Sequence, residues 1–199
     1  MTPLALSVVV LWLVVLALIA VVFALTRQLG VLHERIAPVG ALMLNRGLAV
    51  GEPAPAVDVV DLNGAAMRVG VPRADGKSTL LLFVSPTCPV CKSLLPIVKS
   101  SGRQERDWLD IVLASDGNQQ EHRDYVRAQG LANVPYILSA PLGMTYQVSR
   151  LPFAALIDEA GVLRARGLVN SREHLESLFE AKRLGVASLQ DYFSGAKQP

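Results

Sequence analysis

The run Thr79–Val84 (TLLLFV) is followed almost at once by two cysteines in the arrangement Cys88-Pro89-Val90-Cys91. A short, continuously apolar run is typical of a strand that is buried on both faces of a sheet. Apolar residues at helical spacing come next, and they predict a helix over Pro89–Ser100 with proline at its first position, where proline is favourable. Both cysteines are therefore expected just past the carboxyl end of a buried strand, at the start of a helix.

This placement suits thiol chemistry. Cys88 at the helix start faces the positive end of the helix dipole and unpaired backbone N–H groups, which favour its thiolate form. Cys91 lies one helical turn further on, within reach of a disulfide. A Cys-x-x-Cys pair after a strand in an α/β pattern is a strong redox signal. We predict that Cys88 attacks a partner sulfur and that Cys91 resolves the mixed disulfide.

Other uses of the cysteines are less consistent with the sequence. Two cysteines exclude a disulfide-dense scaffold and a four-cysteine zinc site. The three histidines are His33, His122 and His174, with no pair at metal spacing, and we expect the last two to be solvated on polar helical stretches. We therefore expect no metal. A Cu(I) metallochaperone remains an alternative, which would need a histidine close to the sulfurs. A pure docking protein is a further one.

The rest of the chain after Gly51 has the pattern of a compact α/β domain. The other expected elements are a strand at Val57–Leu62 with a turn at Asn63-Gly64, a buried strand at Asp110–Ala114, a helix at Gln119–Gln129, a hairpin of Phe153–Ile157 with Val162–Val169, and a helix capped by Ser171. The order β-α-β-α-β-β-α predicts a mixed sheet flanked by helices.

A second apolar run, Val8–Leu25, precedes this domain, and no charged side chain occurs before Arg27. At 1.5 Å per residue such a run extends roughly 27 Å, close to the thickness of a bilayer core. A cleaved signal peptide would have a basic start and a shorter apolar core. We predict a transmembrane helix at 4–25, a juxtamembrane stalk at 26–50, the α/β domain at 51–186 and a C-terminal tail at 187–199.

The side of the membrane is not decided by charge. Arg27, Arg35 and Arg46 follow the apolar run, and the positive-inside rule alone would keep the domain in the cytoplasm. Large domains translocate largely regardless of charge, however, and disulfides persist outside the cytosol. We expect a single-pass protein of the inner membrane whose domain faces the periplasm. The net charge of +2 gives no basis for nucleic-acid binding.

Several stretches resemble the membrane-tethered, extracytoplasmic branch of the thioredoxin family, over about Gly51 to Arg183. They are Gly51-Glu52-Pro53-Ala54-Pro55, Asp61-Leu62-Asn63-Gly64, the strand leading into Cys88–Cys91, and Leu151-Pro152-Phe153-Ala154-Ala155-Leu156-Ile157-Asp158. The anchor, Gln28–Pro38 and Ser85–Lys92 are similar, more narrowly, to the MauD family of methylamine utilisation accessory proteins. That resemblance implies an oxidoreductase that assists maturation of the small (beta) subunit of methylamine dehydrogenase, reset by a second thiol–disulfide partner. A general extracytoplasmic thiol reductase, of the cytochrome c maturation type, is the alternative.

The resemblance also implies roles for individual residues. Pro152 would be the cis-proline that faces the active-site cysteines, leaving the Leu151 backbone free to pair with a substrate chain. One position departs from the family, because the buried carboxylate that thioredoxins place six residues before the first cysteine is Leu82 here. Deprotonation of Cys91 must then depend on water or another group. No cofactor is implied.

Overall fold

The computed structural model describes residue 3, residues 11–21 and residues 48–184. Residues 11–21 are helical and exposed. The remainder of the predicted 4–25 helix, the stalk as far as residue 47 and the tail from residue 185 lie outside the described residues. Among the helices that are described, none has the length and apolar character needed to cross a bilayer. The chain divides into one unit up to Asn45 and a second from Arg46, and the fold below is that of the second.

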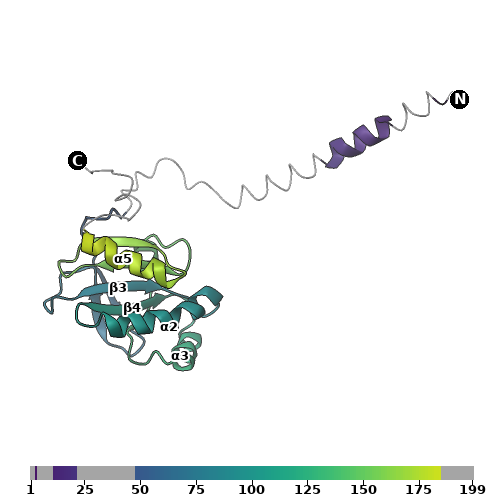
Figure 1. The fold of residues 1–199 in the computed structure, drawn as a ribbon. Coiled ribbons are helices and arrows are strands. Elements are labelled where there is room, and N and C mark those ends of the chain that lie inside the picture. Colours follow the sequence, from purple (N-terminus) through teal and green to yellow (C-terminus); the bar gives the residue numbers. More distant parts are fainter. Residues whose placement is uncertain (1–2, 4–10, 22–47, 185–199) are drawn as a thin grey trace. The chain divides into compact units, whose positions relative to one another are not determined.

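A five-stranded mixed sheet forms the centre of the domain, in the order β5-β4-β3-β6-β7 (Figure 1). Its strands are β3 (Ser78–Phe83), β4 (Leu109–Ser115), β5 (Tyr136–Leu138), β6 (Phe153–Ile157) and β7 (Leu163–Leu168). β4 runs parallel to both β3 and β5, whereas β6 is antiparallel to β3 and to β7. All six residues of β3 are buried, as the apolar run predicted.

Layers on both faces account for this burial. Leu80 and Leu82 contribute to one apolar cluster, with residues of α2 (Pro89–Gln104), α3 (Gln119–Ala128) and α5 (Arg172–Leu184). Leu81 and Phe83 point into a second cluster, which includes residues of α4 (Ala140–Thr145) and of a separate antiparallel hairpin, β1 (Val57–Val60) and β2 (Ala66–Val69). Alternate side chains of one strand thus serve two cores, as the period of two along a strand requires.

The predicted mixed sheet flanked by helices is confirmed for this domain. Two elements, β5 and α4, were not expected. β5 has only three residues and follows Pro135, while α4 has six residues and contains Pro141 in its first turn. Their pattern therefore lacks the length that periodicity needs, and they form through tertiary pairing with β4 and packing on the sheet.

Strand register fixes which end of the sheet carries the cysteines. Phe83, the last residue of β3, pairs with Phe153 at the start of β6, and Phe153 also pairs with Leu168 at the end of β7. The loop to Cys88 and the segment containing Pro152 therefore meet at the same end of the sheet. The opposite end holds the start of β3 and the hairpin between β6 and β7.

Candidate active site

Cys88 is the N-cap residue of α2. Its backbone is extended, and its sulfur accepts a hydrogen bond from the amide of Cys91, with N to Sγ at 3.1 Å. The preceding loop is fixed by the Cys88 amide, which donates to the carbonyl of Ser85 at 3.2 Å. Pro89 occupies the first turn, as predicted. A sulfur at this position receives a backbone N–H that would otherwise have no partner, and a thiolate accepts such a bond better than a thiol does.

Cys91 has the opposite environment. Its side chain is fully buried, whereas that of Cys88 is partly exposed. Burial, and after it the neighbouring Cys88, raise the pKa of Cys91 to about 12. Both cysteines are free thiols in this structure. The pair is therefore asymmetric: one sulfur is accessible to a partner protein, and the other is held protonated beneath it.

Pro152 adjoins this end of the sheet. The Leu151–Pro152 peptide bond is cis, as predicted. Pro152 is buried, and its carbonyl accepts a hydrogen bond from the Val169 amide at 3.0 Å, while Leu151 is 39% exposed. The strand register brings this segment to the end of the sheet where Cys88 lies, so the predicted site residues Cys88, Cys91 and Pro152 come from sequence-distant loops to one end of the fold.

Exposed apolar side chains occur at the same end. Val90 in the first turn of α2 is 41% exposed, and Leu168 at the end of β7 is 48% exposed. Together with Leu151 they offer apolar contact area at the end of the sheet where the accessible sulfur lies. Such a surface suits a partner protein better than a small polar molecule.

His122 corrects a prediction from the sequence. It was expected to be solvated on a polar helix, but only 2% of it is exposed. Its Nδ1 lies 2.9 Å from the hydroxyl of Tyr136, and its Nε2 lies 2.8 Å from the carbonyl of Asp116. Because a carbonyl only accepts, Nε2 donates and Nδ1 accepts from the tyrosine. His174, in contrast, is exposed as expected, and His33 lies outside the described residues.

Both nitrogens of His122 are thus engaged away from the cysteine sulfurs. Within residues 3, 11–21 and 48–184, no three His, Cys, Asp or Glu side chains gather in a way that could hold a metal ion.

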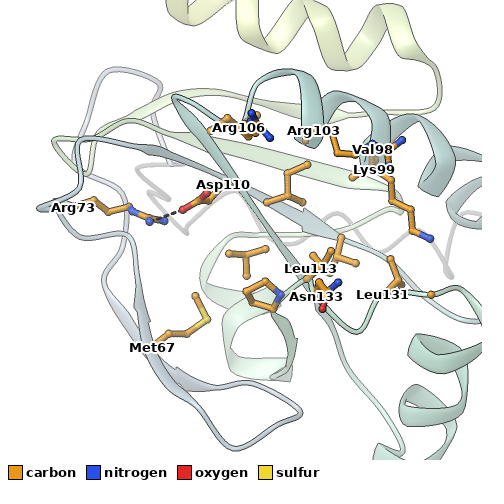
Figure 2. A pocket seen from close by; sticks show the side chains of 17 residues that line it. Met67, Arg73, Val98, Lys99, Arg103, Arg106, Asp110, Leu113, Leu131 and Asn133 are labelled. Carbon is orange, nitrogen blue, oxygen red and sulfur yellow. Dashed lines mark hydrogen bonds and ion pairs between the residues drawn. The ribbon is translucent and has the colours of Figure 1, made fainter.

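A separate cavity of about 680 Å³ lies beside the amino-terminal part of β4 (Figure 2). Arg73, Lys99, Arg103 and Arg106 are among its lining residues, and the Arg73 side chain pairs with Asp110 at 2.6 Å. Neither cysteine nor Pro152 lines it. This hollow is therefore separate from the cysteine pair.

The fold and the placement of the cysteines define a thioredoxin-like protein. Solved structures agree on the fold: the exposed lipoprotein thioredoxin of Streptococcus pneumoniae matches with a TM-score of 0.55 at 19% identity, covering 63% of this chain and 99% of that one. A thiol:disulfide interchange protein of the thioredoxin family from Chlorobium tepidum matches with a TM-score of 0.55 at 18% identity, over 69% and 97% of the two chains.

Sequence relatives narrow the class. The methylamine utilization protein MauD of Paracoccus denitrificans is 44% identical over 190 residues, covering 96% of this chain and 94% of that protein. MauD of Methylorubrum extorquens is 43% identical over 95% of this chain and 91% of its own length. No family model matches the sequence. The chain belongs to the MauD family of methylamine utilization proteins, which confirms the resemblance found in the sequence.

Proposed function

We propose that this protein is a membrane-anchored thiol–disulfide oxidoreductase that assists maturation of the small subunit of methylamine dehydrogenase. The observation that carries the proposal is the asymmetry of the cysteine pair. Cys88 is accessible and its sulfur accepts the Cys91 amide at 3.1 Å, while the Cys91 thiol is buried and has a raised pKa. One sulfur is built to meet a partner, and the other to react only within the protein.

The exchange proceeds in two steps. The Cys88 thiolate attacks one sulfur of a partner disulfide, forming a mixed disulfide and releasing the other partner sulfur as a thiolate. Cys91 then loses its proton and attacks Cys88 Sγ, which forms the Cys88–Cys91 disulfide and frees the second partner sulfur, which takes up a proton. Two electrons pass to the partner. The reverse sequence oxidises two partner thiols, and a second redox protein restores the starting state of the pair.

The partner assignment rests on the family. Relatives across nearly the whole chain are named for methylamine utilization, and the small subunit of methylamine dehydrogenase is the disulfide-rich protein that the family resemblance implies. The exposed Val90, Leu151 and Leu168 beside Cys88 support a protein partner. Capture of the mixed disulfide tests this directly.

In the trapping experiment, Cys91→Ser removes the resolving thiol, so the mixed disulfide on Cys88 accumulates. We expect non-reducing gels of cells producing methylamine dehydrogenase to show an adduct that contains its small subunit and disappears on reduction. Cys88→Ser/Cys91→Ser is the matched control and should give no adduct. Adducts that never contain the small subunit would contradict the partner assignment and leave thiol exchange standing.

We further propose that the apolar segment 4–25 anchors the chain in the inner membrane through contact with lipid, with the domain in the periplasm. The hydropathy of Val8–Leu25 supports an anchor, and the redox chemistry supports a compartment where disulfides persist. Alkaline phosphatase fused after Pro199 should be active, and a reporter that fluoresces only in the cytoplasm should stay dark. The reverse result would place the domain in the cytoplasm.

A further inference from the structure

The buried end of the active site has no carboxylate on β3. Leu82 is completely buried and belongs to the same apolar cluster as Cys91. Among the described residues, the buried carboxylate is Asp158, and it follows Ile157, which pairs with Thr79 at the start of β3. That is the end of the sheet opposite the cysteines. The buried thiol of Cys91 must therefore gain its negative charge without help from an acid beside it.

A different polar group lies in that cluster. The hydroxyl of Tyr125, on α3, is buried and has no hydrogen-bond partner among the described residues. Tyr125 shares the cluster with Cys91 and Tyr136, and its ring lies 6.5 Å from that of Tyr136. Tyr136 differs in that its hydroxyl is bonded to His122 at 2.9 Å. A buried hydroxyl without a partner is costly, so a group that accepts from it in another state of the protein would be stabilised.

The cysteine sulfurs share this apolar cluster with the hydroxyl and act on it electrostatically. Burial, and after it the negative charges of Cys91 and Cys88, raise the pKa of Tyr125 to about 12. The hydroxyl therefore keeps its proton at neutral pH, which makes it a donor. A neutral donor near Cys91 favours the thiolate over the thiol, because it interacts more strongly with the charged sulfur.

We propose that the Tyr125 hydroxyl donates a hydrogen bond to the Cys91 sulfur as that sulfur becomes a thiolate, and so assists the step that resolves the mixed disulfide. The inference rests on the proposed thiol exchange and deepens it. In that step the Cys91–Cys88 bond forms, the Cys88–partner bond breaks, and the proton of Cys91 passes to the departing partner sulfur. Tyr125 keeps its own proton throughout and acts as a positioning residue.

The groups that titrate around Tyr125 come from three elements. Cys88 caps α2 and Cys91 belongs to it, Tyr136 belongs to β5, and His122 belongs to α3 itself. The pKa of Tyr136 is raised by burial, so it also stays protonated. His122 accepts from Tyr136 rather than from Tyr125. The tyrosine hydroxyl without a partner is thus the group to test.

The test uses one equivalent of Ellman's reagent, 5,5′-dithiobis(2-nitrobenzoate), on the reduced full chain. Cys88 releases a first thionitrobenzoate in a second-order phase, and attack by Cys91 on Cys88 Sγ releases a second one in a unimolecular phase. Tyr125→Phe should leave the first phase unchanged. Loss of a hydrogen bond to a charged sulfur lowers the thiolate fraction of Cys91 about tenfold. The more basic thiolate is about threefold more nucleophilic, which offsets part of this loss. The rate of the second phase should therefore fall by about threefold.

Tyr146→Phe is the matched control. Tyr146 is also buried, and its hydroxyl donates to the carbonyl of Pro55 at 3.0 Å, within the other cluster. We expect it to lower the unfolding midpoint and to leave both phases unchanged. Tyr125→Phe should keep or raise that midpoint, because it removes a buried hydroxyl that has no partner.

A direct titration completes the test. In Cys88→Ser protein, Cys91 is the single remaining cysteine, so its ¹³C-labelled Cβ resonance reports its ionisation without overlap. Adding Tyr125→Phe should raise the pKa of Cys91 by about one unit. An unchanged pKa of Cys91 would overturn the inference, whatever happens to the second phase. A slower second phase with an unchanged pKa and a lower unfolding midpoint would mean that the substitution disturbs the structure. Absence of the second phase in the unaltered chain would instead refute the proposed exchange.

Discussion

The two ends of the central sheet are built from the same strands but carry opposite kinds of side chains. At the end where β3 begins, charged groups are paired: Lys182 Nζ lies 2.7 Å from Ser78 Oγ and 2.9 Å from Glu159. Arg73 bridges Asp75 and Asp110. At the end where β3 finishes, Cys88 is accessible, and the buried hydroxyl of Tyr125 has no partner within the part of the chain that the structure describes. One end is arranged for stability, and the other keeps reactive groups available.

The largest effect should come from the reactive end. Cys88→Ser removes the attacking sulfur, and we expect exchange with Ellman's reagent and with protein disulfides to fall by at least about a thousandfold, because Cys91 is buried and protonated at neutral pH. Serine still offers an oxygen to the Cys91 amide, so the unfolding midpoint should change little. Substantial exchange in this variant would contradict the assignment of Cys88.

The stabilising end should respond in the opposite way. The Asp158 carboxylate is buried and accepts from the amides of Ala160 and Val162 at 3.0 and 2.8 Å, and from Arg164 at 2.6 Å. Asp158→Ala leaves these donors without a partner. We expect the free energy of unfolding to fall by about 2–4 kcal/mol, measured by urea denaturation. Exchange rates below the unfolding transition should stay the same, and a parallel loss of activity would show that the two ends are coupled.

A smaller effect should separate docking from chemistry. Val90→Glu adds a charge to the apolar surface beside Cys88 and should slow exchange with a protein partner several-fold, because apolar contact is lost. Reaction with a small uncharged disulfide, 2,2′-dithiodipyridine, should change less, since that reagent makes no such contact and carries no charge for the glutamate to repel. Val60→Glu on β1 is the matched control: Val60 is also exposed, at 56%, and it should affect neither reaction. Equal slowing with both substrates would argue against a docking surface.

The smallest effect concerns acid pH. A hydrogen bond from Arg73, then one from the Lys77 amide, lower the pKa of Asp75 to about 2 from an ordinary value of 3.8. A lowered folded pKa stabilises the protein above pH 3.8, and this stabilisation is lost as the pH falls towards 2. Asp75→Asn should therefore reduce the unfolding midpoint slightly at neutral pH and not at pH 2. The Asp75 side chain is 47% exposed, so the effect should be small. An equal shift at both pH values would mean that its charge contributes nothing.

Much of the reactive end could be predicted from the sequence because its signals are local. A continuous apolar strand, a proline at the first helical position and the Cys-x-x-Cys spacing lie within Thr79–Cys91, and the structure places β3 and α2 there. His122 could not be placed in this way. Its helix is polar in sequence, and both ring nitrogens are bonded outside that helix, to Tyr136 on β5 and to Asp116 in the preceding loop. The hydroxyl of Tyr125 was missed for the same reason.

The capping of α2 by its own reactive sulfur links helix stability to the redox state of the pair. In the reduced protein the Cys91 amide donates to Cys88 Sγ, which is free to carry negative charge. Oxidation makes that sulfur neutral and a weaker acceptor, so the helix start favours the dithiol form. Folding and reduction form a thermodynamic cycle. A folded protein that favours the dithiol over the disulfide more strongly than the unfolded chain does is therefore a stronger oxidant. Each tenfold preference corresponds to about 30 mV, so the difference in unfolding free energy between the reduced and oxidised protein measures how readily the pair accepts electrons.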